Sequence, residues 1–460
     1  MSTDAVVVGS GPNGLAAAVT LAQHGLAVTV LEAREEIGGG TRTLELTVPG
    51  VRHDICSAIH PFGVASPFFG TLPLADHGLV WRYPEVDLAH PLDDGTAGVL
   101  VRDLDATAAG LGEDGERWRS VFGPVAQDLD QLAPDVLGPV VHLPRRPVQL
   151  ARFGLRAALP ATVLARRFRT DAARALFAGA AAHVCRPLDR PTTAGIGTTL
   201  IAAGHRYGWP VAEGGSRAIT DALASLLRSL GGEIRTGVHV RSLVDLPEAR
   251  VVLFDTTPTA FADLAGRPRP RWRYGVAAYK LDLAVRGGVP WTAAACRRAG
   301  TVHVGGTLEA IAHAETQAAR GELPERPFVL VGQQYLADPT RSVGDVHPVW
   351  AYAHVPHAYA GDATDLVLDQ LERFAPGLRE RIVGMHVTDP AGFAAYNPNY
   401  VGGDIAAGAV TVPQLVRRAP YRTGVRGAYL CSSATAPGPG VHGMCGHLAA
   451  RRALRDLGRP

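Results

Sequence analysis

The first 32 residues combine apolar runs with one glycine-rich turn. Residues 6–8 are apolar and β-branched, residues 15–22 place apolar side chains on one helical face, and residues 27–31 form a second apolar run. Short continuous apolar runs are typical of buried parallel strands, and the spacing between them is typical of an amphipathic helix. The pattern therefore predicts a strand, a helix and a parallel strand over residues 6–32.

The turn between the first strand and the helix has the spacing G-x-G-x-x-G. We expect Gly9 to make the tight turn, Gly11 to let backbone approach a pyrophosphate, and Gly14 to bring helix and strand together. The second strand ends on Glu32, at the position of a ribose-binding carboxylate. Strand, turn, helix, strand and acid together predict a dinucleotide site. The remaining turn residues are also expected contacts: Ser10, Pro12 and Asn13.

A second glycine cluster follows the acid. Its expected cofactor contacts are Ala33, Arg34, Gly39, Gly40, Thr41 and Arg42. The glycine doublet offers backbone amides to pyrophosphate and the last arginine offers a cation. This segment resembles the FAD fingerprint of glutathione-reductase-type flavoproteins, in the branch that holds amine oxidases and phytoene desaturases. The resemblance implies non-covalent FAD. Because the sequence has no second G-x-G-x-x-G after a strand and no C-x-x-C pair, we expect no separate NAD domain and exclude disulfide reductase chemistry.

The FAD-binding domain is expected to be assembled from separate pieces. Its pieces are residues 1–75, 205–265 and 415–460, and the substrate or cap domain takes residues 76–204 and 266–414. Leucines at helical spacing predict a helix over 217–230, followed by strands over 233–240 and 251–255. Residues 104–200 are expected to be mostly helical. This layout resembles amine oxidases and phytoene desaturases. The predicted fold is α/β: a doubly wound FAD-binding Rossmann-like domain of the glutathione reductase type, with a mixed α/β substrate domain inserted.

The C-terminal run 429–447 resembles the closing motif of phytoene desaturases. In that family a strand ends in a glycine-rich turn, and the next helix points its N-terminus at the flavin pyrimidine ring to stabilise negative charge there. The resemblance implies cofactor contacts from Gly440, Val441 and His442, of which His442 is also a candidate catalytic group. Ser432 and Ser433 depart from the small glycine and alanine residues of the family, which puts the local geometry of this turn in question.

Residues 54–61 follow the glycine doublet, where relatives in that branch run backbone beside the isoalloxazine ring. Ser57 is therefore expected to contact the cofactor, and His60 to face substrate as a candidate catalytic group. Val240, at the end of the predicted strand 233–240, is a further expected cofactor contact. The other histidines show no metal-ligand spacing with acids or cysteines, so no metal site is predicted.

Lys280 is the only lysine in a chain that otherwise uses arginine for its basic residues. It lies within the apolar run 275–285, after a glycine and before Trp291. Monoamine-oxidase-like enzymes have a similar pattern, in which the lysine holds a water at flavin N5. The resemblance implies a catalytic role for Lys280 beside the flavin. A lysine that survives by chance on the solvent face of a strand is the alternative.

Composition limits the kinds of binding partner and the cellular compartment that we expect for this protein. The formal net charge of +2 over 460 residues implies no nucleic-acid partner. Cysteines without framework spacing and a first strand that leaves no room for a signal peptide favour a reducing bacterial cytoplasm. No apolar run reaches the ~18 residues of a spanning helix. Arginines interleaved with large apolar residues over 145–169 are compatible with peripheral membrane contact or with an ordinary solvated helix face.

These features predict an FAD-dependent oxidoreductase that abstracts hydride from a C–H bond of a mostly apolar small molecule, in the manner of desaturases and dehydrogenases. A flavin amine oxidase and a redox-neutral isomerase that uses reduced flavin are alternatives in the same superfamily. A non-enzymatic flavin-binding protein is an alternative of another class. The sequence names neither the substrate, nor the electron acceptor, nor the oligomeric state.

Overall fold

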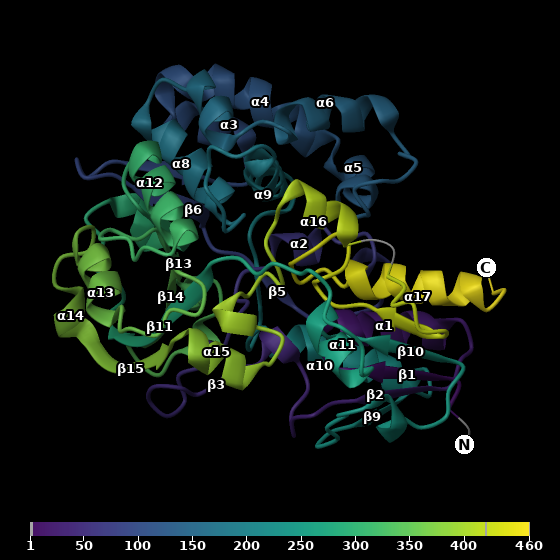
Figure 1. Ribbon diagram of the computed structural model, residues 1–460. Coiled ribbons are helices and arrows are strands. Elements are labelled where there is room, and N and C mark those ends of the chain that lie inside the picture. The colour runs from purple at the N-terminus through teal and green to yellow at the C-terminus, as the bar shows by residue number, and fades with distance from the viewer. Residues whose placement is uncertain (1–2, 419–420, 460) are drawn as a thin grey trace.

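The computed structural model describes residues 3–418 and 421–459. A five-stranded parallel sheet, in the order β16-β10-β1-β2-β9, forms the lower right of the molecule in Figure 1. Its strands are β1 (Ala5–Val8), β2 (Val28–Leu31), β9 (Glu233–Arg235), β10 (Val251–Phe254) and β16 (Ala428–Leu430). Strands from distant parts of the chain thus pair in one sheet, and the doubly wound Rossmann-like prediction is confirmed.

Helices cover both faces of the parallel sheet. One face carries α1 (Pro12–Gln23), α10 (Arg217–Ser229) and α17 (Met444–Asp456), and the other carries α11 (Pro258–Leu264). Helix α10 buries Leu223, Leu226 and Leu227, which form the stripe that predicted it. Helices α1 and α17 pack so closely that a Cβ on Gly446 would lie 1.8 Å from the Asn13 carbonyl oxygen. The glycine at this position allows the close approach.

The predicted strand over 233–240 is wrong in its length. Strand β9 ends at Arg235, and Gly237 takes a φ of +70°, in the left-handed region where glycine is favoured. The chain then turns, so that the Val238 N–H donates to the Glu32 carbonyl at 2.8 Å. This turn brings residues 238–241 over the end of β2.

A seven-stranded sheet, in the order β15-β11-β14-β13-β12-β6-β7, forms the second body, at the lower left of Figure 1. Its strands are β6 (Val86–Pro91), β7 (Ala97–Leu100), β11 (Ala277–Arg286), β12 (Ala299–Val304), β13 (Val329–Gly332), β14 (Val346–Val355) and β15 (Ile382–Thr388). Strands β6 and β12 pair in parallel, and the other neighbours are antiparallel. Two short pairs complete the strands: β3 (Thr43–Leu44) with β4 (His53–Asp54), and β5 (Trp81–Arg82) with β8 (Val211–Ala212).

The segment predicted to be helical forms a layer along the top of Figure 1. Its helices are α3 (Leu104–Gly110), α4 (Gly115–Gln127), α5 (Leu129–Val136), α6 (Pro147–Ala157), α7 (Ala161–Leu164), α8 (Asp171–Ala182) and α9 (Thr193–Tyr207). An aromatic cluster around Trp118, Phe122 and Phe177 forms its core.

Six further helices complete the fold of the described residues. They are α2 (Pro61–Val64), α12 (Leu308–Arg320), α13 (Thr364–Glu372), α14 (Leu378–Arg381), α15 (Pro390–Tyr396) and α16 (Val412–Arg417). Within the described ranges, no helix has the length and apolar character needed to cross a bilayer.

Candidate functional site

A cavity of about 910 Å³ runs from the parallel sheet to the seven-stranded sheet. Val8 and Leu31, the last residues of β1 and β2, line one end of it, and Leu330 of β13 and Trp350 of β14 line the other. In doubly wound proteins, ligands bind outside the carboxyl ends of the parallel strands. The cavity begins at this position.

The glycine turn after β1 forms one wall of the cavity. Gly9 has a φ of +103°, where a side chain would strain the backbone. A Cβ on Gly11 would meet Asp255 Oδ2 at 2.7 Å, and a Cβ on Gly14 would meet the Gly9 carbonyl oxygen at 2.1 Å. Only hydrogen fits at these positions, so the bare backbone of the turn faces the cavity.

Ser10, Pro12 and Asn13 line the same wall. The Asn13 side-chain amide donates to Ser433 Oγ at 3.3 Å, which ties the turn to the C-terminal segment. Its Oδ1 atom is buried and has no hydrogen-bond partner in the described part of the chain. A buried acceptor of this kind is costly unless something satisfies it, and a ligand hydroxyl or amide would do so.

Glu32 ends β2 and lies nearly buried in the cavity wall. Its Oε2 accepts hydrogen bonds from the Ser10 N–H at 3.0 Å and the Ser10 hydroxyl at 2.5 Å. Its Oε1 accepts the Arg34 N–H at 3.0 Å and lies 3.3 Å from Arg42 Nη2. These donors compensate the buried charge and hold the carboxylate beside the glycine turn. Two smaller predicted contacts line the cavity as well: Ala33 and Val240.

The second glycine cluster packs directly on the first. A Cβ on Gly39 would lie 3.0 Å from Gly11 Cα, and Gly39 itself has a φ of +53°. Gly40 and Thr41 line the cavity beside it. The Arg42 guanidinium also lines the cavity, but it pairs with Glu32 and lies 5.5 Å from the centre of the Tyr396 ring. Its predicted role at a pyrophosphate stays a prediction.

Asp255, to which the sequence assigns no role, lies beneath the glycine turn. Its Oδ2 accepts the Gly14 N–H at 3.0 Å, and its side chain lines the cavity. Burial and the nearby Glu32 carboxylate raise the pKa of Asp255 to about 7, against the opposing effect of the Gly14 and Gly11 N–H groups. The Asn399 side chain accepts the Thr257 N–H at 2.9 Å, and so attaches the loop 397–404 to this end of β10.

Ser57 and His60 line the cavity farther along. The Ser57 N–H donates to the Gly40 carbonyl at 3.0 Å. Ser216 Oγ donates to the Ser57 carbonyl at 2.7 Å and lies 2.8 Å from His60 Nε2, which therefore carries the proton that it donates to Ser216. Burial lowers the pKa of His60 to about 4, so the ring is neutral at pH 7. Its Nδ1 is a bare acceptor with no partner in the described chain.

His442 lies behind the C-terminal turn and not among the cavity-lining residues, whereas Gly440 and Val441 line the cavity. The His442 Nδ1 accepts the N–H of Met444, the first residue of α17, at 3.0 Å. Burial lowers its pKa to about 4, so this ring is also neutral. The structure therefore gives His442 a positioning role at the start of α17, and its catalytic role stays a prediction.

Ser432 and Ser433 join the two strand ends that flank the cavity. The Ser432 hydroxyl donates to the Thr256 carbonyl at 2.7 Å, and Ser433 Oγ accepts from Asn13. Both serines line the cavity. The serines that depart from the phytoene-desaturase motif thus hold the turn in place.

Comparisons with known proteins agree with this geometry. The NAD(P)-binding Rossmann-like domain family matches residues 7–70. Pyridine nucleotide-disulfide oxidoreductase domain-containing protein 2 of Rattus norvegicus is 26% identical over 99% of this chain and 94% of its own length. Hydroxyneurosporene desaturase of Cereibacter sphaeroides is 30% identical over 52% of this chain and 50% of its own. A putrescine oxidase solved with putrescine shares the fold over 100% of both chains, with a TM-score of 0.63 and 17% identity.

The chain is therefore similar over nearly its whole length to an oxidoreductase-domain protein, and it shares its fold with flavin amine oxidases. These similarities imply a flavin or nucleotide cofactor. The predicted fold class and the predicted resemblance to flavin-dependent oxidoreductases are confirmed.

Lys280 lies behind the cavity wall. The side chain is 1% exposed, on strand β11, and its ammonium pairs with the Asp282 carboxylate. Its Nζ lies 5.9 Å from the ring centre of Trp350, which does line the cavity. The alternative of a solvent-facing lysine is wrong, because the group is buried. The predicted role at flavin N5 stays a prediction.

The far end of the large cavity contains residues to which the sequence assigns no role. They include His183, Cys185, Trp209, Thr301, Trp350 and Tyr352. They come from the helical layer and the seven-stranded sheet, and no local motif connects them. Alternation along β14 does place Trp350 and Tyr352 on one face of that strand, which is the signal that was available.

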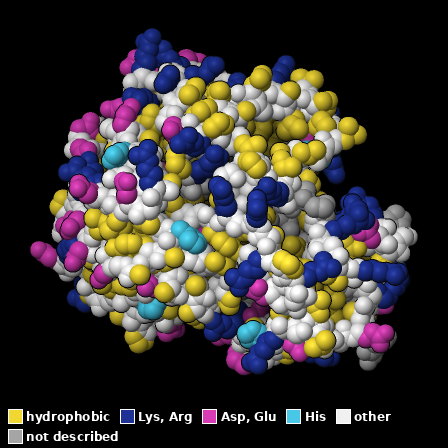
Figure 2. All heavy atoms as spheres, in the orientation of Figure 1, with side chains coloured by type: hydrophobic (Ala, Val, Ile, Leu, Met, Phe, Trp, Pro, Cys, Tyr) yellow, Lys and Arg dark blue, Asp and Glu magenta, His cyan; other side chains and the backbone are white. Residues whose placement is uncertain are grey.

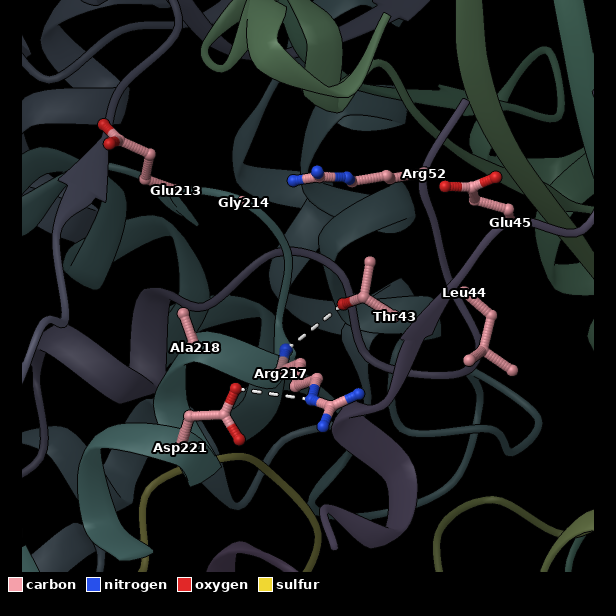
Figure 3. Close-up of a pocket in the computed structure, with 9 residues that line it drawn as sticks. All are labelled: Thr43, Leu44, Glu45, Arg52, Glu213, Gly214, Arg217, Ala218 and Asp221. Atoms are coloured by element: carbon pink, nitrogen blue, oxygen red, sulfur yellow. Dashed lines mark hydrogen bonds and ion pairs between the residues drawn. The ribbon is translucent and has the colours of Figure 1, made fainter. Parts of the chain in front are cut away.

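A second, smaller hollow of about 440 Å³ lies beside the start of α10 (Figure 3). Arg217 dominates it: its guanidinium lies 3.3 Å from Asp221 and 2.9 Å from Glu36. The Arg217 N–H also donates to Thr43 Oγ1 at 3.2 Å. The charges of Arg217, Asp221 and Glu36 thus compensate one another.

Proposed function

We propose that the protein is an FAD-dependent oxidoreductase that abstracts hydride from a C–H bond of a mostly apolar small molecule. One observation carries the proposal: a single cavity is lined by the dinucleotide turn at one end and by Ile196, Leu200 and Leu330 at the other. A cofactor extended from the turn would reach toward these apolar side chains. A substrate would bind between them and the cofactor.

The residues of the near end fit FAD. The glycine turn leaves no room for a Cβ, Glu32 stands beside it, and Asn13 offers a buried unpaired acceptor. Backbone of the two glycine clusters would hold the pyrophosphate, and Glu32 would accept hydrogen bonds from ribose hydroxyls. When bound, a flavin supplies a hydride acceptor.

The chain's own groups would orient and shield the reacting bond. His60, neutral and with a bare Nδ1, would accept a hydrogen bond from whatever lies against it. Trp209 and Trp350 line the far end and would exclude water there. Lys280 and His442 are proposed to act from behind the wall, by holding Asp282 and the start of α17.

The lining of the far end favours the desaturase type over the amine oxidase type. Among the described residues that line the cavity, the carboxylates are Glu32, Asp255 and Asp263, all in the near half. A cationic amine buried at the far end would meet no opposite charge in the lining, which is unfavourable. A neutral, apolar molecule fits this lining better.

The test begins with the cofactor. Acid denaturation of the purified protein should release FAD into the supernatant at about one equivalent. Protein that stays colourless after reconstitution with FAD, or flavin that remains in the pellet, would contradict the assignment.

Substrate class is tested next, by anaerobic bleaching of the flavin. Neutral apolar alkenes and alcohols should bleach it faster than primary amines of the same carbon number. Product masses lower by two hydrogens would support dehydrogenation, whereas unchanged masses would support the isomerase. Faster bleaching by the amines would favour the amine oxidase alternative.

A further inference from the structure

Three side chains form a connected series that starts at the far end of the cavity and runs into the protein interior: Cys185, which lines the cavity, then His354 and Glu315, which are buried behind it. Glu315 Oε1 lies 2.6 Å from His354 Nδ1, and His354 Nε2 lies 3.5 Å from Cys185 Sγ. Glu315 comes from α12, His354 from β14, and Cys185 from the loop that follows α8. A thiol, an imidazole and a carboxylate in this order are the parts of an activated nucleophile.

The geometry fixes the role of each group. Because Glu315 Oε1 accepts from Nδ1, the Nε2 atom of His354 is the one that faces the thiol. Burial alone would lower the pKa of His354, but the Glu315 carboxylate and the hydrogen-bonded Cys185 side chain raise it well above the ordinary value. Glu315 is fully buried, and its Oε2 has no partner in the described chain. The imidazole can therefore take and hold the thiol proton.

Cys185 is presented to the cavity. It lines the cavity and is half-buried, whereas the other cysteines are buried. Its φ of +52° is rare for a residue with a side chain, and strain of this kind concentrates at functional sites. Tyr352 lines the cavity next to His354, with ring centres 5.6 Å apart, and burial raises the pKa of Tyr352 well above its ordinary value. Its phenol therefore stays a hydrogen-bond donor.

We propose that Cys185, His354 and Glu315 form a nucleophilic site that takes the carbonyl carbon of an apolar aldehyde. The Cys185 S–H proton passes to His354 Nε2 and the thiolate forms an S–C bond. The carbonyl π electrons move to oxygen, which receives the proton back from His354, so that thiol and aldehyde give a hemithioacetal with no change of oxidation state. Tyr352 is placed to donate to the oxygen, and Leu330 and Trp209 to contact the chain of the aldehyde.

This addition needs no cofactor, so it stands or falls separately from the FAD assignment. The test measures the alkylation rate of each cysteine by iodoacetamide in the full-length protein, read by peptide mass spectrometry. Cys56 is the matched control: it also lines the cavity, but burial raises its pKa and Tyr400 is its neighbour in place of a histidine. We expect Cys185 to react at least tenfold faster than Cys56.

Two variants test whether His354 and Glu315 activate the Cys185 thiol. His354→Gln and the isosteric Glu315→Gln should each slow Cys185 at least tenfold while leaving Cys56 unchanged in the same molecules. Thermal melting checks that each variant is folded. If a variant does not fold, the comparison of Cys185 with Cys56 in the wild type still tests the proposal. Equal rates at Cys185 and Cys56 in the wild type, or a Cys185 rate that neither folded variant changes, would overturn the proposal.

Octanal and octan-1-ol then test the ligand class. Octanal should protect Cys185 from iodoacetamide in a saturable and reversible way, whereas octan-1-ol at the same concentration should not. Equal protection by both would mean that an apolar chain merely covers the thiol, and this result would overturn the aldehyde assignment. Absence of protection by octanal would overturn it as well.

Discussion

The carboxylate of Asp255 accepts the Gly14 N–H at 3.0 Å, so a half-buried acid lies directly beneath the turn that would hold a pyrophosphate. Burial and Glu32 raise the pKa of Asp255 to about 7. An ionised Asp255 would repel the pyrophosphate, and a protonated one would not. We therefore expect the protonation of Asp255 to couple pH to cofactor binding.

We predict that FAD affinity falls as the pH rises through 7. Bound pyrophosphate favours the protonated form of Asp255. Above the pKa of Asp255, each unit of increase in pH should therefore weaken the binding free energy of FAD by up to about 1.4 kcal/mol. FAD dissociation constants measured by fluorescence between pH 6 and 8.5 should rise in the wild type. Asp255→Asn, which keeps the shape and removes the charge, should flatten the profile. Parallel profiles in the two proteins would assign the dependence to another group.

The same acid predicts a slope in the stability of the FAD-free protein. Its pKa is about 7 in the folded state and ordinarily 3.8, so the folded protein binds more protons between these values. Its contribution to stability is fully present below pH 3.8 and is lost as the pH rises through 7. The free energy of unfolding of the wild type, relative to Asp255→Asn, should therefore fall over this window. A difference that stays constant would contradict the raised pKa.

Gly14→Ala should abolish cofactor binding. The added Cβ would lie 2.1 Å from the Gly9 carbonyl oxygen, so the start of α1 has to move away from β1. The expected protein is colourless and melts at a lower temperature. Gly154→Ala is the control, because a Cβ there meets nothing within 4 Å on helix α6; it should be neutral or slightly stabilising, by up to ~1 kcal/mol. Normal FAD content in Gly14→Ala would contradict the proposed turn.

The sequence is informative where function depends on neighbours in the chain. The glycine turn and Glu32 lie in one β-α-β unit, so their spacing alone predicts the site. Asp255 and Gly14 are 241 residues apart, and Cys185 and His354 are 169 residues apart. These pairs exist only because separate segments meet at the cavity, and single-sequence periodicity carries no information about such pairing.

Lys280 shows a second limit of prediction from a single sequence. The sequence identifies it as unusual, but the resemblance places it at the flavin, whereas the structure pairs it with Asp282. Residues two apart on a strand share a face, so the spacing of Lys280 and Asp282 was itself a signal for this pair. Resemblance and strand geometry thus lead to different expectations, and a variant separates them.

Lys280→Met should destabilise the protein by about 3–5 kcal/mol, because Asp282 is left buried without its cation. Urea unfolding measures this loss. If Lys280 also acts on the flavin, reoxidation of the reduced protein by oxygen should slow about tenfold, or ~1.4 kcal/mol. The double variant Lys280→Met with Asp282→Asn removes both charges and should recover much of the stability. Wild-type reoxidation in the folded double variant would rule out a role for the ammonium at N5.

The last prediction concerns the exposed surface of residues 140–155, which we propose as a contact for anionic lipid. Leu143 is 94% exposed and Leu155 is 76% exposed, and Figure 2 shows hydrophobic side chains gathered over this region, where Figure 1 places α5 and α6. The run 136–170 contains no Asp or Glu. Arg145, Arg146 and Arg152 have no ion-pair partner within the described ranges.

Apolar side chains flanked by unpaired arginines fit an anionic lipid surface. The leucines would be buried in the acyl region, and the arginines would be attracted to the anionic headgroups. The protein should float with vesicles of phosphatidylcholine and phosphatidylglycerol at low salt, and less so as salt screens the arginines. Leu143→Ser with Leu155→Ser should weaken flotation at least fivefold. Val244→Ser is the control, because Val244 is 89% exposed but lies outside this surface. Failure to float at low salt, or equal losses in both variants, would remove the lipid assignment and leave an ordinary solvated helix face.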